Sequence, residues 1–307
     1  HRAAAEVVPV GRDAKRAASG DVRGPAVFVL VVGETARAED FSLDAHERQT
    51  NPRPQAADVF YFSAVSACGT STAVSLPCMF SDLGRDGFSE TAMRGRENLL
   101  DVLARAGLDA LIRDNRREDG LWARATDDAG AILDPTPDLY DMAFVLFALA
   151  AAHRVLKDAR ARALALETLA AVEARMADPV HGGWQEALPP VLPRRQNPHM
   201  HMLEAMLAWR ATAPDPAFDA AARSVLDLFQ RRFFDREHLM LGEFYERDWS
   251  VRPGSEGQCV EPGHHMEWVW LLGEAERLGL PDQGAAARAL YAGAPTCGVR
   301  ADGLAVR

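Results

Sequence analysis

Six segments after about residue 120 carry apolar residues at helical spacing, and this pattern constrains the fold more than any other feature of the chain. The loops between these segments are alternately short and long. Short loops join antiparallel helices, so the pattern predicts a series of helical hairpins that form a helical barrel or a solenoid. The six predicted helices are residues 138–156, 160–177, 199–212, 216–234, 264–279 and 282–294.

The first hundred residues follow a different pattern, which is typical of an α/β fold. Residues 25–32 (PAVFVLVV) are all apolar, and this predicts a strand buried on both faces of a sheet, with Glu34 just beyond its end. Residues 57–65 are a second predicted strand. Residues 97–107 have helical spacing, and Gly107 is the residue at which we expect that helix to end.

Charge and hydropathy exclude some classes of partner. The net charge of −10 and the pI of about 5.4 argue against nucleic acid or an anionic membrane surface as a partner. A membrane-spanning helix needs about 18 consecutive apolar residues. The longest apolar run in the chain has the length of a strand, so we expect no membrane span.

Two of the predicted helices begin with histidines. In QNPHMHMLEA, Asn197 is a candidate N-cap, and His199 and His201 fall in the first turn. In EPGHHMEWVWLL, His264 follows Pro-Gly, and Glu267 lies one turn further on. Histidine titrates near neutral pH, and helix N-termini favour developing negative charge. The pattern therefore predicts a site that transfers protons to and from a carbon acid.

Other interpretations of these residues stay open. A histidine at a helix start is often a cap or a surface residue, and His199 with His201 is compatible with a metal pair, although no third ligand follows at a characteristic spacing. Arg195 lies just upstream, and Trp268 is one of several tryptophans near the two motifs. Tryptophan rings stack on sugar rings, but they also pack in hydrophobic cores, so both interpretations of these residues stay open.

The segments DPTPDLYDMAFVLFALA, HGGWQEALPP, RRQNPHMHMLEAMLA and CVEPGHHMEWVWLL resemble the N-acylglucosamine 2-epimerase family, which includes mannose isomerases. The resemblance implies an (α/α)6 barrel, here partial, over residues 108–307. It also implies that sugars are isomerised or epimerised through an enediol without a metal or other cofactor. By this resemblance His264 is a general acid/base, and His201 and Glu267 are catalytic or substrate contacts. The further substrate-binding residues are then Tyr140, Arg195, His199 and Trp268.

The segment CGTSTAVS places hydroxyl residues between a tight Cys-Gly turn and a predicted helix over residues 72–81. Thr72 is a candidate nucleophile if a metal held by Glu34 lowers the pKa of its hydroxyl. The alternative is an ordinary helix cap rich in serine and threonine. Cys68 and Cys78 flank this segment, and their spacing fits a disulfide and two reduced thiols equally well.

The segments VPVGRDAKR, FVLVVGETARAEDFSL, ERQTNP and CGTSTAVSLPCMFS resemble the start of the catalytic domain of lipid A phosphoethanolamine transferases, relatives of the sulfatases and alkaline phosphatases. The resemblance covers residues 1–107. It implies that Glu34 and Thr72 are zinc ligands, that Thr72 is the nucleophile, and that Cys68 and Cys78 form a periplasmic disulfide. His46 stands where this family usually has tyrosine.

The predicted architecture is mixed: a partial α/β fragment over residues 1–107, followed by a partial all-α barrel over residues 108–307. The first functional hypothesis is a sugar isomerase or 2-epimerase that acts on a small-molecule sugar. The alternatives are a zinc-dependent phosphoethanolamine transferase and a catalytically inactive fusion of two partial domains. The barrel part predicts a cytoplasmic location, whereas the transferase-like part implies the periplasm.

Overall fold

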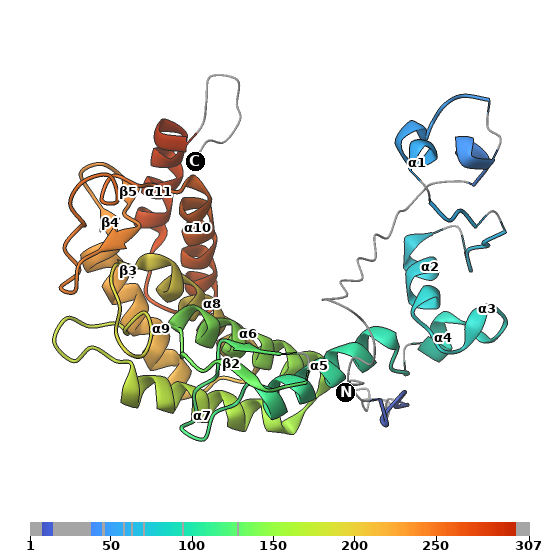
Figure 1. The fold of residues 1–307 in the computed structure, drawn as a ribbon. Coiled ribbons are helices and arrows are strands. Elements are labelled where there is room, and N and C mark those ends of the chain that lie inside the picture. Colours follow the sequence, from blue (N-terminus) through green and yellow to red (C-terminus); the bar gives the residue numbers. More distant parts are fainter. Residues whose placement is uncertain are drawn as a thin grey trace. The chain divides into compact units, whose positions relative to one another are not determined.

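The computed structural model describes residues 8–14, 38–44, 47–57, 59–62, 64–69, 71–93, 95–127 and 129–298 (Figure 1). The chain divides into two compact units, His1–Gly107 and Leu108–Arg307. The predicted strand at residues 25–32 lies outside the described residues, as do Glu34 and His46.

The residues of the N-terminal unit that the structure describes form helices and irregular segments. Its described elements are two 3-10 helices, Ala38–Asp40 and Ser42–Asp44, and the helices α1 (Pro52–Ala56), α2 (Thr72–Met79), α3 (Gly84–Gly87), α4 (Glu90–Met93) and the first half of α5 (Leu99–Asp114). The predicted helix over residues 72–81 is therefore present as α2, two residues shorter.

The predicted strand at residues 57–65 is wrong for the residues of this segment that the structure describes, none of which is in a strand. Phe60 is 94% exposed and Phe62 is 76% exposed. A strand needs a neighbouring strand to pair with, and the described residues of this segment pair with none. The short apolar run alone was not enough to define a strand.

A buried carboxylate joins the two ends of the N-terminal unit. Glu97 accepts hydrogen bonds from the backbone N–H of Val10 (3.0 Å), from Arg12 (3.0 Å) and from Arg105 (2.9 Å). The last of these partners lies on α5, which continues to Asp114. The predicted end of this helix at Gly107 is therefore wrong, because the apolar spacing runs on through Leu108, which is buried.

The C-terminal unit is built from three helical hairpins, and all six predicted helices are present. The first helix of each hairpin packs against the next: α6 contacts α8, and α8 contacts α10, while α7, α9 and α11 each pack on the helix before them. The helices are α6 (Leu139–Leu156), α7 (Ala159–Arg175), α8 (Gln196–Thr212), α9 (Pro216–Leu228), α10 (Pro262–Arg277) and α11 (Gly284–Gly298).

Three short two-stranded antiparallel sheets lie in the loops of this unit, and the helical pattern did not predict them. They pair β1 (Ala125–Thr126) with β2 (Ile132–Asp134), β3 (Arg194–Arg195) with β6 (Phe244–Tyr245), and β4 (Phe234–Asp235) with β5 (Met240–Leu241). The predicted helix at residues 216–234 is α9 followed by one π-helical segment, Phe229–Phe233. Strands of two or three residues are too short to leave a periodic signal.

Helix α6 is long and apolar enough to cross a membrane, with a mean hydropathy of 1.5 over 18 residues. Its inward side chains, such as Met142, Leu146 and Leu149, are fully buried against the rest of the helical core. Core helices of globular proteins pass the same test of length and composition, and the packing of α6 fits that class.

Trp209 ties three helices of the core together. It lies on α8 with no exposed surface, its indole N–H donates to the backbone oxygen of Leu146 on α6 (2.9 Å), and its ring stacks on Phe218 of α9 at 5.0 Å. A tryptophan with this burial and a satisfied N–H contributes both apolar area and a specific hydrogen bond.

We predict that Trp209→Ala lowers the free energy of unfolding of the C-terminal unit by about 3–5 kcal/mol, because it leaves a cavity and removes the hydrogen bond of the indole N–H. Urea titration followed by far-UV circular dichroism measures the change. Trp270→Ala is the matched control: this side chain is 58% exposed, so its removal should cost less than about 1 kcal/mol. Equal losses in the two variants would contradict the role of Trp209.

Candidate active site

The pairing of β3 with β6 brings the two long loops of the C-terminal unit together at the start of α8. Arg194 pairs with Tyr245 and Arg195 with Phe244, and the ladder ends with the backbone N–H of Gln196 donating to the carbonyl of Glu243 (3.3 Å). The first residue of α8 and the residue just before β6 are therefore neighbours. This contact places the Glu243 carboxylate at the N-terminus of a helix, where negative charge is favoured.

His264, in the first turn of α10, meets both of these residues. Its Nδ1 lies 2.9 Å from Oε2 of Glu243 and 3.1 Å from Nε2 of Gln196, and its Nε2 lies 3.0 Å from Nδ2 of Asn197. The indole N–H of Trp268 donates to Oε1 of Gln196 (2.6 Å). The starts of α8 and α10 thus meet around one imidazole.

The charge of His264 is set by its carboxylate neighbours. Burial disfavours the imidazolium, but the hydrogen bond and the charge of Glu243, with smaller contributions from Glu261 and Glu267, outweigh it and raise the pKa of His264. Glu267 is exposed. A histidine whose pKa is raised from 6.5 is suited to take up and return a proton near neutral pH.

Asn197 is not the N-cap residue that the sequence predicted. Helix α8 begins at Gln196 with Arg195 as its N-cap residue, so Asn197 lies inside the first turn and its side chain contacts His264 instead of capping the helix. His201 lies four residues further along α8 and so on the same side of the helix. Asn197 and His201 therefore lie on one side of α8.

His201 is held by a carboxylate and two aromatic rings. Its Nδ1 lies 2.9 Å from Oε2 of Glu204, and its ring contacts Phe144 at 4.7 Å and Tyr140 at 5.2 Å between centroids. Both aromatic side chains come from α6 and are partly exposed. Their exposed ring faces, next to an imidazole, are the kind of surface that packs on the apolar face of a sugar.

Arg195 keeps its guanidinium at the edge of this region. Its backbone N–H donates to Oε1 of Glu186 (2.5 Å), and its Nε donates to Oε2 of the same carboxylate (2.8 Å). Glu186 is buried, and burial raises its pKa, although the charge of Arg195 opposes this shift. The buried carboxylate fixes the stem of an arginine that is itself about one third exposed.

Two residues predicted to bind substrate lie in the core instead. His199 and Trp268 have no exposed surface. Nε2 of His199 accepts from the backbone N–H of Trp184 (3.0 Å), and its Nδ1 contacts the carbonyl of Arg195 (3.2 Å). This does not fit a substrate contact: the helical periodicity turns His199 inward and His201 outward. Gly183 is required here, since at φ +70° a Cβ would lie 2.8 Å from Nε2 of His199.

Sequence reasoning missed Glu243 and Gln196. Glu243 lies in an irregular loop, and its contact with His264 spans 21 residues of sequence. The only local signal for Gln196 was its position next to the histidine motif. Neither residue has a spacing that marks it as part of a site, because a long-range pairing of two short strands brings them together.

A groove of about 280 Å³ extends along α6, α8 and α10 beyond Glu204. Its walls include Phe147 of α6 and Trp270 of α10, and Arg154 and Arg277 also line it. Glu204 is shared between this groove and the contact with His201. The face that carries His201 therefore opens onto a concave surface with both aromatic and charged groups.

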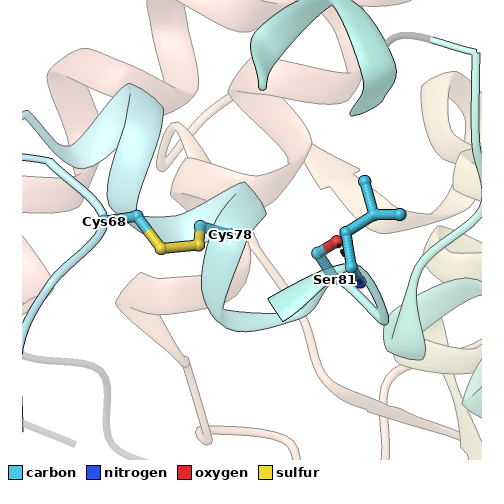
Figure 2. Close-up of a disulfide and its surroundings, with 4 residues drawn as sticks. Cys68, Cys78 and Ser81 are labelled. Carbon is cyan, nitrogen blue, oxygen red and sulfur yellow. Dashed lines mark hydrogen bonds between the residues drawn. A yellow bond between two sulfur atoms is a disulfide. The ribbon is translucent and has the colours of Figure 1, made fainter. Parts of the chain in front are cut away.

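The predicted zinc site is not found among the residues that the structure describes, which contain no group of three or more metal-binding side chains. Glu34 lies outside those residues, and Thr72 is the first residue of α2. A disulfide joins Cys68 to Cys78, the latter in the last turn of α2 (Figure 2). Just beyond, Ser81 Oγ accepts from the backbone N–H of Leu83 (3.0 Å).

Known structures with the same arrangement of helical hairpins are of the (α/α)6-barrel type. A cellobiose 2-epimerase from Spirochaeta thermophila is 26% identical, with a TM-score of 0.57, over 64% of this chain and 53% of that one. A D-mannose isomerase matches with a TM-score of 0.55 at 22% identity, over 66% of this chain and 54% of that one, and supports the fold alone.

Residues 87–306, more than half of the chain, match the family model of N-acylglucosamine 2-epimerase (GlcNAc 2-epimerase). The chain therefore belongs to the N-acylglucosamine 2-epimerase family. The mannose-6-phosphate isomerase of Rhizobium meliloti is 34% identical over 209 residues, which are 66% of this chain and 54% of that protein. The chain thus spans about half the length of this relative.

The N-terminal part is similar to a different family. Residues 26–118 match the sulfatase family model. The phosphoethanolamine transferase EptA of Salmonella typhimurium is 45% identical over 112 residues, and the phosphatidylethanolamine transferase Mcr-1 of Escherichia coli is 47% identical over 108 residues. These matches cover 36% and 35% of this chain and 20% of each relative. The two family matches overlap at residues 87–118.

We predict that acid destabilises the C-terminal unit through His199. Burial, with a smaller contribution from the charge of Arg194, lowers the pKa of His199 from 6.5 to about 3. Between these values the unfolded chain takes up a proton that the folded chain does not, so stability falls as pH falls. His199→Gln should remove up to about 1.4 kcal/mol per pH unit of that loss. Urea titrations between pH 6.5 and 4 measure it.

His238→Gln is the control for this experiment. Asp235 raises the pKa of His238, which is exposed, so its stabilising contribution is present at low pH and is lost as pH rises. The fall in the free energy of unfolding between pH 6.5 and 4 should therefore be at least as large in His238→Gln as in the wild type. An unchanged pH slope in His199→Gln would show that His199 is not held neutral.

Proposed function

We propose that the C-terminal unit isomerises or epimerises a sugar, with His264 as the general acid/base. The observation that supports this best is the position of the His264 ring, between the carboxylate of Glu243 at Nδ1 and the amide of Asn197 at Nε2, in the first turn of a helix. Nδ1 is held by a charged partner, whereas Nε2 contacts only the neutral amide of Asn197, so we assign the proton exchange to Nε2.

The reaction needs one base and a place for negative charge. Nε2 of His264 removes the proton from the carbon next to the sugar carbonyl, and the electron pair of that C–H bond forms an enediolate. Return of the proton to C1, with transfer of the hydroxyl proton from the C2 oxygen to the C1 oxygen, gives the ketose. The C2 epimer forms only when a second donor delivers a proton to C2 from the face opposite to His264. The N-termini of α8 and α10 stabilise the negative charge that develops on the oxygens.

Two buried oxygens are available for substrate hydroxyls. Oδ1 of Asn197 and Oε1 of Glu243 have no hydrogen-bond partner among the residues that the structure describes. Buried acceptors are rarely left unpaired, so a sugar hydroxyl that donates to them gains a full hydrogen bond. In this proposal Tyr140 and Arg195 contact the same ligand, Tyr140 through its exposed ring and Arg195 through its guanidinium.

The names of the relatives suggest the substrates to try first: mannose, mannose 6-phosphate and cellobiose. We propose a hexose of the mannose type, because the mannose-6-phosphate isomerase matches at 34% identity and the cellobiose 2-epimerase of Bacteroides fragilis at 25%. Because the chain spans about half of these relatives, its activity has to be measured on the full chain itself.

We predict that the wild-type chain incorporates deuterium from heavy water at C2 of the substrate, and that His264→Gln lowers this exchange by about 10²- to 10⁴-fold, since it removes the base. Proton NMR of mannose incubated with enzyme measures the exchange. His238→Gln, a change at an exposed histidine, should leave it unaltered. Exchange that persists in His264→Gln would rule out this assignment.

A second candidate function rests on the similarity of the N-terminal part to phosphoethanolamine transferases. We propose that the Thr72 hydroxyl attacks the phosphorus of phosphatidylethanolamine: the new bond is Thr O–P, and diacylglycerol leaves with the proton. A zinc ion would lower the pKa of the attacking hydroxyl. The described residues do not supply a set of zinc ligands, so no step is assigned to the metal.

We predict for this candidate that wild-type protein, incubated with phosphatidylethanolamine vesicles and zinc, gains one phosphoethanolamine group on Thr72. Intact-protein and peptide mass spectrometry detect the group. Thr72→Ala is the control and should gain none. If the wild type stays unmodified, the second candidate fails and the N-terminal unit is a catalytically inactive part of a fusion.

A further inference from the structure

We infer that Trp268 and Gln196 are positioning residues that act through Glu243 to keep a proton on Nδ1 of His264, so that Nε2 is the nitrogen that exchanges protons. The role as an acid/base rests on the proposed function, whereas the position of the proton does not. The four side chains form one hydrogen-bonded series that links α8, α10 and the loop before β6.

The series starts from a group that can only donate. The indole N–H of Trp268 has no acceptor capacity, so the atom of Gln196 that it contacts at 2.6 Å is the amide oxygen. This contact fixes the orientation of the Gln196 amide. Its Nε2 then faces the other way, toward Glu243 and His264.

The Glu243 carboxylate is held by this amide in a dry environment. Nε2 of Gln196 donates to Oε2 of Glu243 at 2.9 Å. Gln196 and Trp268 are fully buried, and Glu243 is 4% exposed. Water therefore does not compete for these contacts, and the carboxylate oxygen stays within reach of the imidazole.

The carboxylate selects the tautomer of His264. Glu243 can only accept, so the nitrogen that it contacts, Nδ1, carries the proton, and this charge-assisted hydrogen bond is stronger than a neutral one. Nε2 then presents its lone pair to Nδ2 of Asn197 at 3.0 Å. With no carboxylate, the second N–H of Gln196 would donate to Nδ1 at 3.1 Å and would favour the opposite tautomer, which cannot act as a base at Nε2.

The other charged groups near His264 do not replace Glu243. Glu261 and Glu267 raise the pKa of His264 through their charge, after the larger contribution of Glu243. His265, its neighbour on α10, is neutral: burial lowers its pKa, its Nε2 accepts from the backbone N–H of Leu241 (3.1 Å), and its Nδ1 contacts the carbonyl of Glu261 (3.1 Å). Glu243 is thus the charged partner that selects the tautomer.

Ring ¹⁵N NMR on full-length protein labelled with ¹⁵N-histidine tests this directly, because protonated and unprotonated ring nitrogens have distinct shifts. His264→Gln assigns the signals. We predict the Nδ1–H tautomer in the wild type, the Nε2–H tautomer in Glu243→Gln, and a mixture in Trp268→Phe. Gln196→Met, which keeps the length of the side chain, should also give a mixture and serves if Trp268→Phe does not fold.

Activity provides a second measurement. If His264 is the base, Glu243→Gln should lower kcat for C2 exchange by about 10²-fold or more, since the bound substrate meets the wrong tautomer. The acidic limb of its pH profile should move to lower pH, because loss of the carboxylate lowers the pKa of His264. His238→Gln, a change at an exposed histidine outside this series of side chains, is the control and should change neither measurement.

The outcomes separate the two claims. If the tautomer of His264 is the same in the wild type, Trp268→Phe and Gln196→Met, the positioning role is overturned whatever the activity. If the tautomer changes as predicted but the wild type shows no exchange with any of the three sugars, the positioning role stands and the proposed function fails.

Discussion

One buried cation, Arg194, organises the loops on which the candidate site depends. It has no exposed surface, forms an ion pair with Asp178 (2.8 Å), and lies 3.6 Å from the centre of the Trp249 ring. It also donates to the carbonyls of Gly182 and Arg247. Removing one partner of a buried pair leaves an uncompensated charge, which typically costs about 3–5 kcal/mol. The loop that carries Asp178 and Gly182 is therefore fixed to the loop that carries Arg247 and Trp249. Substitutions at this contact should be strongly destabilising.

The same arginine opens β3, so its fixed backbone determines where the next residues lie. Pairing of β3 with β6 sets Gln196 beside Glu243, and the first turn of α10 then brings His264 to both. The precision of the site thus comes from irregular segments, while the helices supply a rigid frame. A substitution at Arg194 would disturb the His264 surroundings without touching any residue of the site.

The sequence predicted the six helices of the C-terminal unit well, because helical spacing is a local property. It failed where the outcome depended on distant partners. Gly107 did not end α5, since the apolar spacing continued beyond it, and residues 59–62 found no strand to pair with. His199 and His201 carried the same signal, and only the phase of α8 separated the core residue from the partly exposed one. The role of Glu243 could not be predicted from the sequence, because its partner, His264, is 21 residues away.

Five of the six tryptophans, Trp122, Trp184, Trp209, Trp249 and Trp268, are no more than 2% exposed, whereas Trp270 on the wall of the groove is 58% exposed. Collisional quenchers dissolved in water reach an indole only through its exposed surface. The quenchable part of the intrinsic fluorescence therefore comes from Trp270. The chain carries its own optical reporter, located on the face that connects the groove with His201.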